Sequence, residues 1–288
     1  MSVDKLFDIR NNFYIGNFQG CISEAQKLAA KTEDEKQSKD VYINRAYIAQ
    51  GKSSVVLAEV PASTKSEALK AVRRLAEFET TKNPEKLIEQ VEGEAQSSSD
   101  DYARIVYGSL FLSASKPEET LKLLHNVEHL EARAASIHAL LAMDRPDLAM
   151  KELKRMSEMD EDATITQLAT AWVNLTIGKE KLKDAFYIFQ EMIDKYGATP
   201  YLLVGQSNAL IAQGQGGDAE KVLDEVLSRD PNSAEAMVNR IRAILANESA
   251  KPANNLGKKQ LVQVTATNPK HPFVEEIENA TIALERLT

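Results

Sequence analysis

The residues with the clearest potential for chemistry form the stretch HNVEH at 125–129, where two histidines stand four residues apart with a glutamate between them. On a helix, histidines at this spacing share a face and can hold zinc, while the carboxylate acts as the base of a hydrolase. A third ligand is not evident, because the chain has only 4 histidines in all. We therefore expect surface or turn histidines, and a zinc hydrolase that uses His125, Glu128 and His129 remains a remote alternative.

Two other features with chemical potential have simpler interpretations. The glycine cluster GQGGD at 214–218 resembles a phosphate-binding helix start, but a P-loop needs Lys and Ser or Thr after the glycines, and here Asp218 and Ala219 follow. The only cysteine, Cys21, has no evident base or electropositive setting, so we expect a thiol packed between helices. The sequence predicts no catalytic residue, no cofactor and no metal site, and therefore no enzyme.

The composition favours a soluble helical protein. Hydrophobic residues make up 43% and charged residues 27%, with only 12 glycines and 9 prolines, a balance that favours helix over strand. A net charge of -8 without a basic stripe argues against nucleic-acid binding. No signal peptide or long apolar run is evident and the single cysteine allows no intramolecular disulfide, so we expect a cytosolic protein.

Turn-forming residues recur along the chain at intervals of 29 to 36 residues. Their types tolerate or support the left-handed backbone that ends a helix. Between the turns, apolar residues spaced four and then three apart share one helical face, as at Ala185, Phe189 and Met192. A period near 34 with an A-x-x-x-F element is typical of tetratricopeptide repeats (TPRs). The turn residues are Gly16, Gly51, Asn83, Ser115, Asp144, Gly178 and Gly214.

These repeats predict an all-α fold, a TPR-like α-solenoid of about seven to eight helix hairpins. All 9 prolines fall at expected helix boundaries, where they interrupt no helical hydrogen bond. We expect a single domain over residues 1–288, with a less certain repeat phase over 249–270. A C-terminal capping helix is expected from about 273 to 287, because a stack of repeats needs a covered end.

The first helices of successive TPR pairs line a concave groove. The repeat phase places mostly apolar and aromatic side chains on this face, which suits an apolar segment of another protein. A competing interpretation is that several of them, Trp172 above all, fill the core between neighbouring pairs. The predicted groove residues are Phe13, Tyr14, Arg45, Ile48, Tyr102, Ile105, Leu112, His138, Leu141, Trp172, Leu175, Tyr201, Asn208 and Ile211.

An alternative for the groove is a co-chaperone clamp for acidic C-terminal peptides. Such a clamp grips two carboxylates with Lys, Asn and Arg at set positions. Asn208 and Asn239 occupy two of these positions, but Val204 stands where the first Lys is needed. The incomplete set leaves the clamp, or another scaffold that recognises peptide segments, as the weaker alternative.

Four segments of the chain resemble the coatomer ε subunit family of the COPI vesicle coat. The most specific part is DEDATITQLATAWVNL, because generic TPR rules do not require it. The resemblance is weakest over 62–100 and 249–270. The four segments are LFDIRNNFYIGNFQGCISEAQ at 6–26, KELKRMSEMDEDATITQLATAWVNL at 151–175, KLKDAFYIFQEM at 181–192 and HPFVEEIE at 271–278.

The resemblance implies a non-catalytic structural or adaptor subunit that binds and stabilises the C-terminal region of coatomer subunit alpha, and through it meets the rest of coatomer. It implies a role in Golgi-to-ER retrograde and intra-Golgi vesicle transport. The expected location is cytoplasmic, peripheral on Golgi membranes and COPI-coated vesicles, with indirect membrane contact only. The repeats by themselves predict only a protein-binding solenoid.

Overall fold

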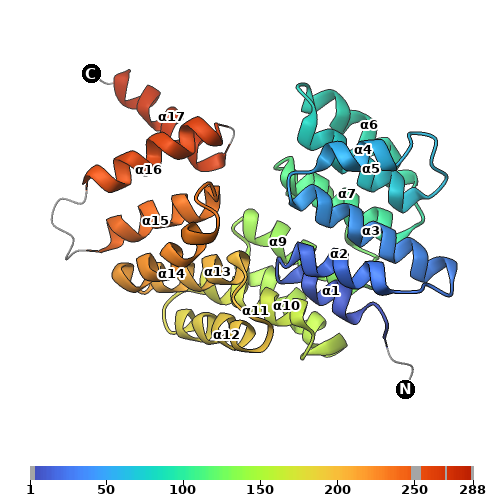
Figure 1. Cartoon of the computed structure of the whole chain (residues 1–288), viewed down its shortest axis with the longest axis horizontal. Helices are drawn as coiled ribbons and strands as arrows, with labels where there is room; N and C mark the ends of the chain where they lie inside the picture. The colour runs from blue at the N-terminus through green and yellow to red at the C-terminus, as the bar shows by residue number, and fades with distance from the viewer. Residues whose placement is uncertain (1–3, 248–253, 270, 287–288) are drawn as a thin grey trace. The chain divides into compact units, whose positions relative to one another are not determined.

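The computed structural model describes residues 4–247, 254–269 and 271–286, and within them it contains seventeen α-helices and no β-strand (Figure 1). This confirms the predicted all-α fold. The helices form two compact units, Met1–Thr176 and Ile177–Thr288. The single domain predicted from the sequence stays a prediction, and each unit is described by itself below.

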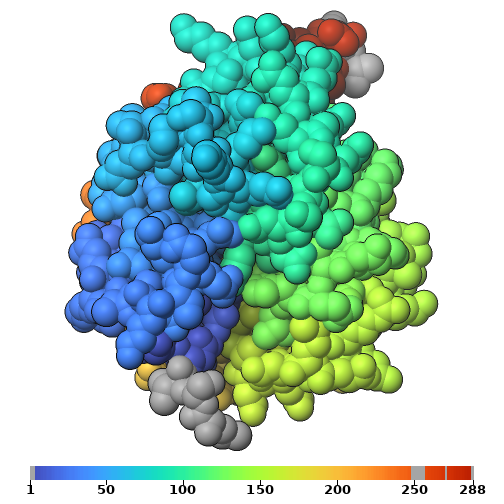
Figure 2. All heavy atoms as spheres, turned by 90° about the vertical axis from the view of Figure 1, so that its right-hand side faces the viewer, coloured from blue at the N-terminus to red at the C-terminus, as the bar shows by residue number. Residues whose placement is uncertain are grey.

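The first unit contains eleven helices within its described residues, the last of which ends at the boundary between the units. They are α1 (Phe7–Tyr14), α2 (Phe18–Lys27), α3 (Glu33–Ala49), α4 (Ser53–Glu59), α5 (Glu67–Thr80), α6 (Pro84–Ser97), α7 (Asp101–Ser113), α8 (Pro117–Leu124), α9 (Leu130–Ala142), α10 (Pro146–Asp160) and α11 (Thr164–Ile177). Consecutive odd-numbered helices from α1 to α9 pack against one another, and each even-numbered helix from α2 to α8 contacts both of its neighbours in sequence. Figure 2 shows one face of this unit, where the blue N-terminal side chains lie against green ones from later helices.

The second unit continues the same alternation through its described residues. Its helices are α12 (Lys181–Tyr196), α13 (Pro200–Ala212), α14 (Gly216–Arg229), α15 (Ala234–Ala246), α16 (Asn254–Thr267) and α17 (Pro272–Glu285). Helix α16 lies in the region whose repeat phase the sequence left uncertain, and 248–253 lies outside the described residues. No helix within the described parts of either unit has the length and apolar character needed to cross a membrane.

The predicted turn residues end helices in the expected way, with one exception. Six of the seven have a left-handed backbone, with φ between 55° and 76°. The exception is Asn83, with φ at -124°. Pro84 follows it and begins α6, and the residue before a proline is driven into extended backbone. The six left-handed residues are Gly16, Gly51, Ser115, Asp144, Gly178 and Gly214.

The prolines stand at helix boundaries, as predicted. Five occupy the first turn of a helix, where the missing N–H would have had no intrahelical partner. Pro61, Pro231 and Pro269 lie in connections, and Pro252 lies outside the described residues. The five that begin helices are Pro84, Pro117, Pro146, Pro200 and Pro272.

The small-and-large pattern on the second helix of each pair builds the core. Ala185 and Phe189 of α12 are almost completely buried, at 0% and 1% exposure. Gly205 of α13 lies directly against the Phe189 ring, where a Cβ atom would overlap the ring carbons. The alternation of small and large side chains therefore sets how closely α12 and α13 approach.

The glycine cluster is a helix turn followed by a close helix contact. Gly214 has a left-handed φ of 76° and ends the turn after α13. Gly216 begins α14, and a Cβ atom there would overlap the carbonyl oxygen of Ala243 in α15. The cluster thus permits close packing of α14 against α15, which explains the glycines without a bound phosphate.

Helix α17 forms where the capping helix was expected, but it covers the end of the unit with its first turn only. Val274 is buried, and with Phe273 it packs against Met237, Val238 and Val264. From residue 275 to 286 every residue is exposed. Most of the surface of α17 therefore faces solvent.

Candidate protein-binding site

One of the predicted groove residues of the N-terminal helices, Arg45, is part of a buried ion pair. Arg45 of α3 and Glu131 of α9 are joined by an Nη2–Oε1 contact, and their side chains are only 7% and 8% exposed. Helix α9 is capped by His129, whose Nδ1 accepts the backbone N–H of Glu131. Arg45 therefore binds the protein's own carboxylate, and its charge is not accessible to a partner in this conformation.

Aromatic side chains complete a cluster around this pair. The Tyr42 hydroxyl donates to Glu131 Oε2 at 3.0 Å, and the Tyr14 hydroxyl donates to the same atom at 3.3 Å. The Arg45 guanidinium carbon lies 4.5 Å from the centroid of the Phe13 ring, a cation–π contact. We call these five residues, Phe13, Tyr14, Tyr42, Arg45 and Glu131, the α9 clasp, because they fasten α1 and α3 to α9.

The electrostatics of the α9 clasp are those of a structural group. Burial would raise the pKa of Glu131, but the charge and hydrogen bond of Arg45 outweigh it and hold that pKa below its usual range. Burial and the Glu131 charge raise the pKa of Tyr42 and of Tyr14, so both hydroxyls stay neutral donors. Arg45 Nη1 is buried without a hydrogen-bond partner among the described residues. Removing either charge would leave the other buried and uncompensated.

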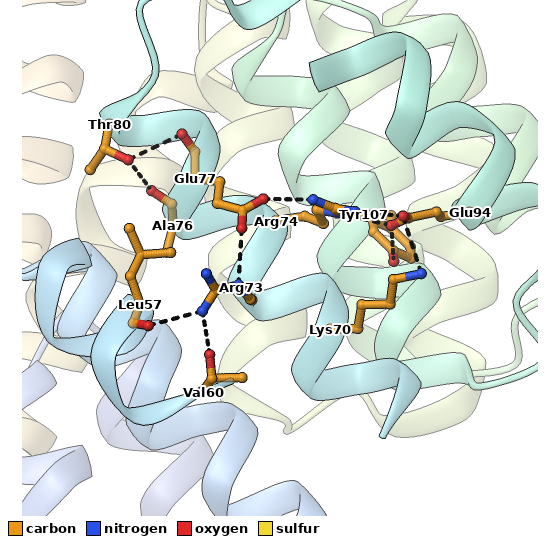
Figure 3. A network of polar contacts seen from close by, with 10 residues as sticks. All are labelled: Leu57, Val60, Lys70, Arg73, Arg74, Ala76, Glu77, Thr80, Glu94 and Tyr107. Carbon is orange, nitrogen blue, oxygen red and sulfur yellow. Dashed lines mark hydrogen bonds and ion pairs between the residues drawn. The ribbon is translucent and has the colours of Figure 1, made fainter. Parts of the chain in front are cut away.

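A second polar cluster, shown in Figure 3, joins α5, α6 and α7. Glu94 accepts from Arg74 Nε and Nη2 at 3.0 and 2.7 Å, lies 3.1 Å from Lys70 Nζ, and accepts the Tyr107 hydroxyl at 3.3 Å. In the same view Arg73 donates to carbonyl oxygens at the end of α4. Each of these charges is compensated by the protein, so the cluster supports the helix stack and offers no unpaired charge to a ligand.

An accessible aromatic surface lies on α9 and α11. The His138 and Trp172 rings stack in parallel, with centroids 5.0 Å apart and planes inclined by 9°. Leu141 and Leu175 follow them by three residues on the same helix faces, and both are half-buried. The His138 side chain is partly accessible, and packing of the ring lowers its pKa below the usual range, which favours the neutral form. We call these four residues the His138–Trp172 patch, and it presents uncharged aromatic and apolar surface.

The predicted groove residues of the second unit lie on α13. Tyr201 is 39% exposed, while Asn208 and Ile211 are half-buried. Ile211 packs against the hydrophobic core of this unit. Tyr201 and Asn208 are two helical turns apart and share a face, so they form the accessible part of this set.

The remaining predicted groove residues lie mainly in the core of the first unit. Ile48 and Ile105 are buried, at 9% and 1% exposure. Tyr102 and Leu112 are half-buried, and the Tyr102 ring makes an edge contact with the His129 ring at 5.9 Å. The groove pattern of the sequence therefore contains both core and accessible positions.

One of the two asparagines that the clamp alternative requires, Asn239, is hydrogen-bonded within the protein. Asn239 is 3% exposed, donates to the Glu235 carbonyl at 2.9 Å and accepts from Arg242 at 3.2 Å. Val204, at the position that would need Lys, packs against the core. The Asn239 amide is thus not accessible to a bound carboxylate.

The HNVEH residues do not form a metal site in this structure. Residues 125–129 follow the end of α8 and are not helical, so the two histidines share no helix face. Glu128 pairs with Arg133 at 3.0 Å, and His129 caps α9. Across the described ranges, no group of three or more His, Cys, Asp or Glu side chains is placed to hold a metal.

Cys21 is the packed thiol that the sequence predicted. It is fully buried in α2, and burial raises its pKa to about 12. A thiol with such a pKa is almost entirely protonated at neutral pH, which leaves it a poor nucleophile.

Sequence reasoning missed two members of the α9 clasp, Tyr42 and Glu131. Glu131 lies in the first turn of α9, a helix that is otherwise rich in Ala and Leu, and a charge on a largely apolar helix is a signal of burial with a partner. That signal does not identify Arg45, which lies 86 residues earlier in the chain. Neither residue has a local pattern that connects it to its partner.

The stacked helix pairs and their left-handed turns define a TPR-like α-solenoid, a class of repeat scaffolds that offer extended binding surfaces. A tetratricopeptide repeat protein from Parabacteroides merdae has a similar structure, with a TM-score of 0.56 at 11% identity. The similarity covers 97% of this chain and 98% of that one. At this identity the likeness supports the fold alone.

Sequence comparison gives the family. The profile of the family "Coatomer epsilon subunit" matches residues 2–288. The chain is 38% identical over 289 residues to coatomer subunit epsilon of Caenorhabditis elegans, covering 99% of this chain and 97% of the relative. It is 30% identical to coatomer subunit epsilon-2 of Arabidopsis thaliana, covering 98% and 95%. The chain belongs to the coatomer epsilon subunit family, which supports a role as a structural subunit of the COPI coat.

Proposed function

We propose that the protein is a non-catalytic adaptor subunit of COPI that binds and stabilises the C-terminal region of coatomer subunit alpha. Through that subunit it joins the rest of coatomer. The proposed process is Golgi-to-ER retrograde and intra-Golgi vesicle transport, on the cytoplasmic side of Golgi membranes and on COPI-coated vesicles. Family membership supports the place in the coat.

The observation that carries the proposal is the His138–Trp172 patch. Protein interfaces concentrate their binding energy in aromatic residues that a partner can cover completely. The parallel stack presents an aromatic surface, and the lowered pKa of its histidine favours the neutral ring, so an apolar segment can cover it without burying a charge. This chemistry suits an apolar segment of the alpha subunit.

Tyr201 is proposed as a second contact, in the other unit. It is 39% exposed at the start of α13, so part of the side chain is accessible to a partner. Asn208, two turns later on the same face, has a buried Oδ1 atom without a hydrogen-bond partner among the described residues. Rotation of the Asn208 side chain toward solvent would let that oxygen accept a backbone N–H of a bound segment.

Titration calorimetry of the full chain with the C-terminal region of coatomer subunit alpha tests the proposal. We expect a stoichiometric complex that His138→Ala or Trp172→Ala weakens by about tenfold or more, because interface aromatics contribute about 2 kcal/mol each. Tyr187→Ala is the matched control, since Tyr187 is 66% exposed on α12 and outside the proposed contacts.

The His138→Ala variant distinguishes a loss of binding from a loss of folding. His138 is exposed, whereas Trp172 also contributes to the core. Circular dichroism of each variant should show unchanged helical content. A wild-type chain that forms no complex, or a His138→Ala chain that folds and binds as tightly as the wild type, would contradict the proposal.

A further inference from the structure

Helix α17 extends well beyond the part of it that is packed. Val274 is 1% exposed, but every residue from 275 to 286 is exposed. Isolated helices shorter than about 12–15 residues are marginal in water, and most helical stability in proteins comes from packing an apolar face. The outer turns of α17 therefore depend on little beyond their own hydrogen bonds in the free chain.

Helix α17 carries an ordered apolar stripe that begins in its packed first turn and continues along its exposed part. Phe273, Ile277, Ala280 and Leu284 follow one another at spacings of four, three and four, the seam of a helix that packs against another helix. Ile277 is 38% exposed and Leu284 is 65% exposed. Ile282, at 47%, lies on the opposite side of the helix.

Exposed apolar side chains are concentrated at this end of the second unit. Of the twelve large apolar side chains that are exposed among the described residues, five lie between Leu245 and Leu284. A concentration of apolar surface on a soluble protein marks an interaction site. The stripe on α17 is its most regular part.

The negative charge around the stripe indicates which kind of partner can bind there. Residues 271–286 contain four glutamates against one arginine, a formal charge of -3 with histidine neutral. Glu275, Glu276 and Glu278 form no ion pair with any described residue, and Glu276 directly precedes Ile277 in the stripe. At 100° per residue, Glu276 lies at the edge of the stripe, whereas Glu275 lies on the opposite side of α17. An occupant with lysines or arginines beside its own apolar residues would neutralise Glu276 and reduce the net negative charge of this end.

We propose that the stripe Phe273–Ile277–Ala280–Leu284 docks a helix of another coatomer subunit that carries apolar residues at heptad spacing flanked by lysines or arginines. Charge argues against the other occupants. A second copy would bring two acidic helices together, and an anionic membrane surface would repel α17. The inference rests on membership in coatomer, and it is independent of the proposed contacts at Trp172 and Tyr201.

Photocrosslinking in the assembled complex tests this inference. Coatomer is reconstituted from all its subunits with a photoreactive phenylalanine analogue in place of Ile277, and with the same analogue in place of Ile282 as the matched control. We expect an adduct from position 277 to a helix of another subunit whose apolar residues are flanked by lysines or arginines. The yield should be about tenfold lower from position 282, because that side chain lies on the opposite face.

Charge reversal provides the second arm of the test. Glu276→Lys with Glu278→Lys should lower the yield from position 277 by about tenfold, since like charges then face each other. Glu158→Lys with Glu161→Lys, at exposed positions near the end of α10, should leave it unchanged.

An adduct with the chain itself, with a second copy or with lipid would overturn the proposal, as would equal yields from the two positions or insensitivity to the α17 charges. Absence of any adduct in a complex that still contains the alpha subunit would overturn this inference alone. Failure of the alpha region to bind the isolated chain would instead count against the proposed function.

Discussion

The first and last described helices of the chain are held in opposite ways. Helix α1 is fixed in its middle and at its end, because Ile9 is buried in the core and Phe13 and Tyr14 reach α3 and α9 through rings and hydroxyl groups. Helix α17 is fixed by its first turn and exposes the rest. In a stack of repeats each unit contacts only its neighbours, so the terminal helices lack one neighbour. The difference shows that this protein covers its first helix with its own residues, through the α9 clasp, and leaves most of its last helix exposed to solvent.

The two ends also differ in the kind of interaction that holds them. The α9 clasp is a buried ion pair with aromatic partners. Neither charge can be removed without leaving the other buried and uncompensated. The surface of α17 is apolar and acidic, and its Glu275, Glu276 and Glu278 form no ion pair with any described residue. Changes at the first end should therefore act on stability, whereas changes at the last should act on association.

The largest effect is expected from Glu131→Ala. Removal of this carboxylate leaves Arg45 buried and uncompensated, which should lower the free energy of unfolding by about 3–5 kcal/mol. Urea unfolding followed by Trp172 fluorescence measures it in the unit that contains the α9 clasp. Arg45→Met with Glu131→Leu should be less destabilised than the single variant. A loss below about 1 kcal/mol in Glu131→Ala would place the pair in a solvated setting.

A smaller effect is expected from pH. The folded-state pKa of Glu131 lies below its unfolded value, so its contribution to stability is present above the unfolded pKa and is lost as pH falls through the folded one. Between the lowered folded-state pKa and the unfolded value of about 4.3, this single group adds a slope of up to about 1.4 kcal/mol per pH unit. Urea unfolding of the wild type and of Glu131→Gln between neutral and acidic pH should show a shallower loss in the variant. Equal slopes would contradict the assignment.

The smallest effect is expected at α17. Ile277→Ser with Leu284→Ser should change the free energy of unfolding of the isolated chain by no more than about 0.5 kcal/mol, because both side chains are exposed. Thermal or urea unfolding measures it, with Val274→Ser as the contrasting variant at the buried anchor. Destabilisation of the double variant by as much as Val274→Ser would mean that the stripe is covered by the chain itself.

Local patterns in the sequence predicted the fold because turns and helix starts are local events. Gly214 and Asp144 reveal left-handed turns by residue type, and Pro146 reveals the helix that follows. Asn83 differed because the proline directly after it restricts its backbone. Each of these outcomes depends on a few neighbouring residues.

Which side chains are accessible to solvent could not be predicted from local sequence patterns in the same way. Arg45 fits the groove pattern, but its burial depends on Glu131. Glu131 lies several helix pairs later in the chain, and the small rotation between successive pairs brings it next to Arg45. The exposure of α17 is likewise a property of what packs beside it, although its helical stripe is visible in the sequence. His138 and Trp172 were both placed in the groove, but their ring stacking needed the arrangement of α9 and α11.

The most direct test of the contrast between the two ends is backbone hydrogen exchange of the chain alone and within reconstituted coatomer. We expect slow exchange in the second halves of α1 and α9 in both states. We expect fast exchange at 276–285 in the free chain and strong protection of the same residues in the complex. Protection of 276–285 that is already complete in the free chain, or that fails to increase in the complex, would contradict this difference between the two ends.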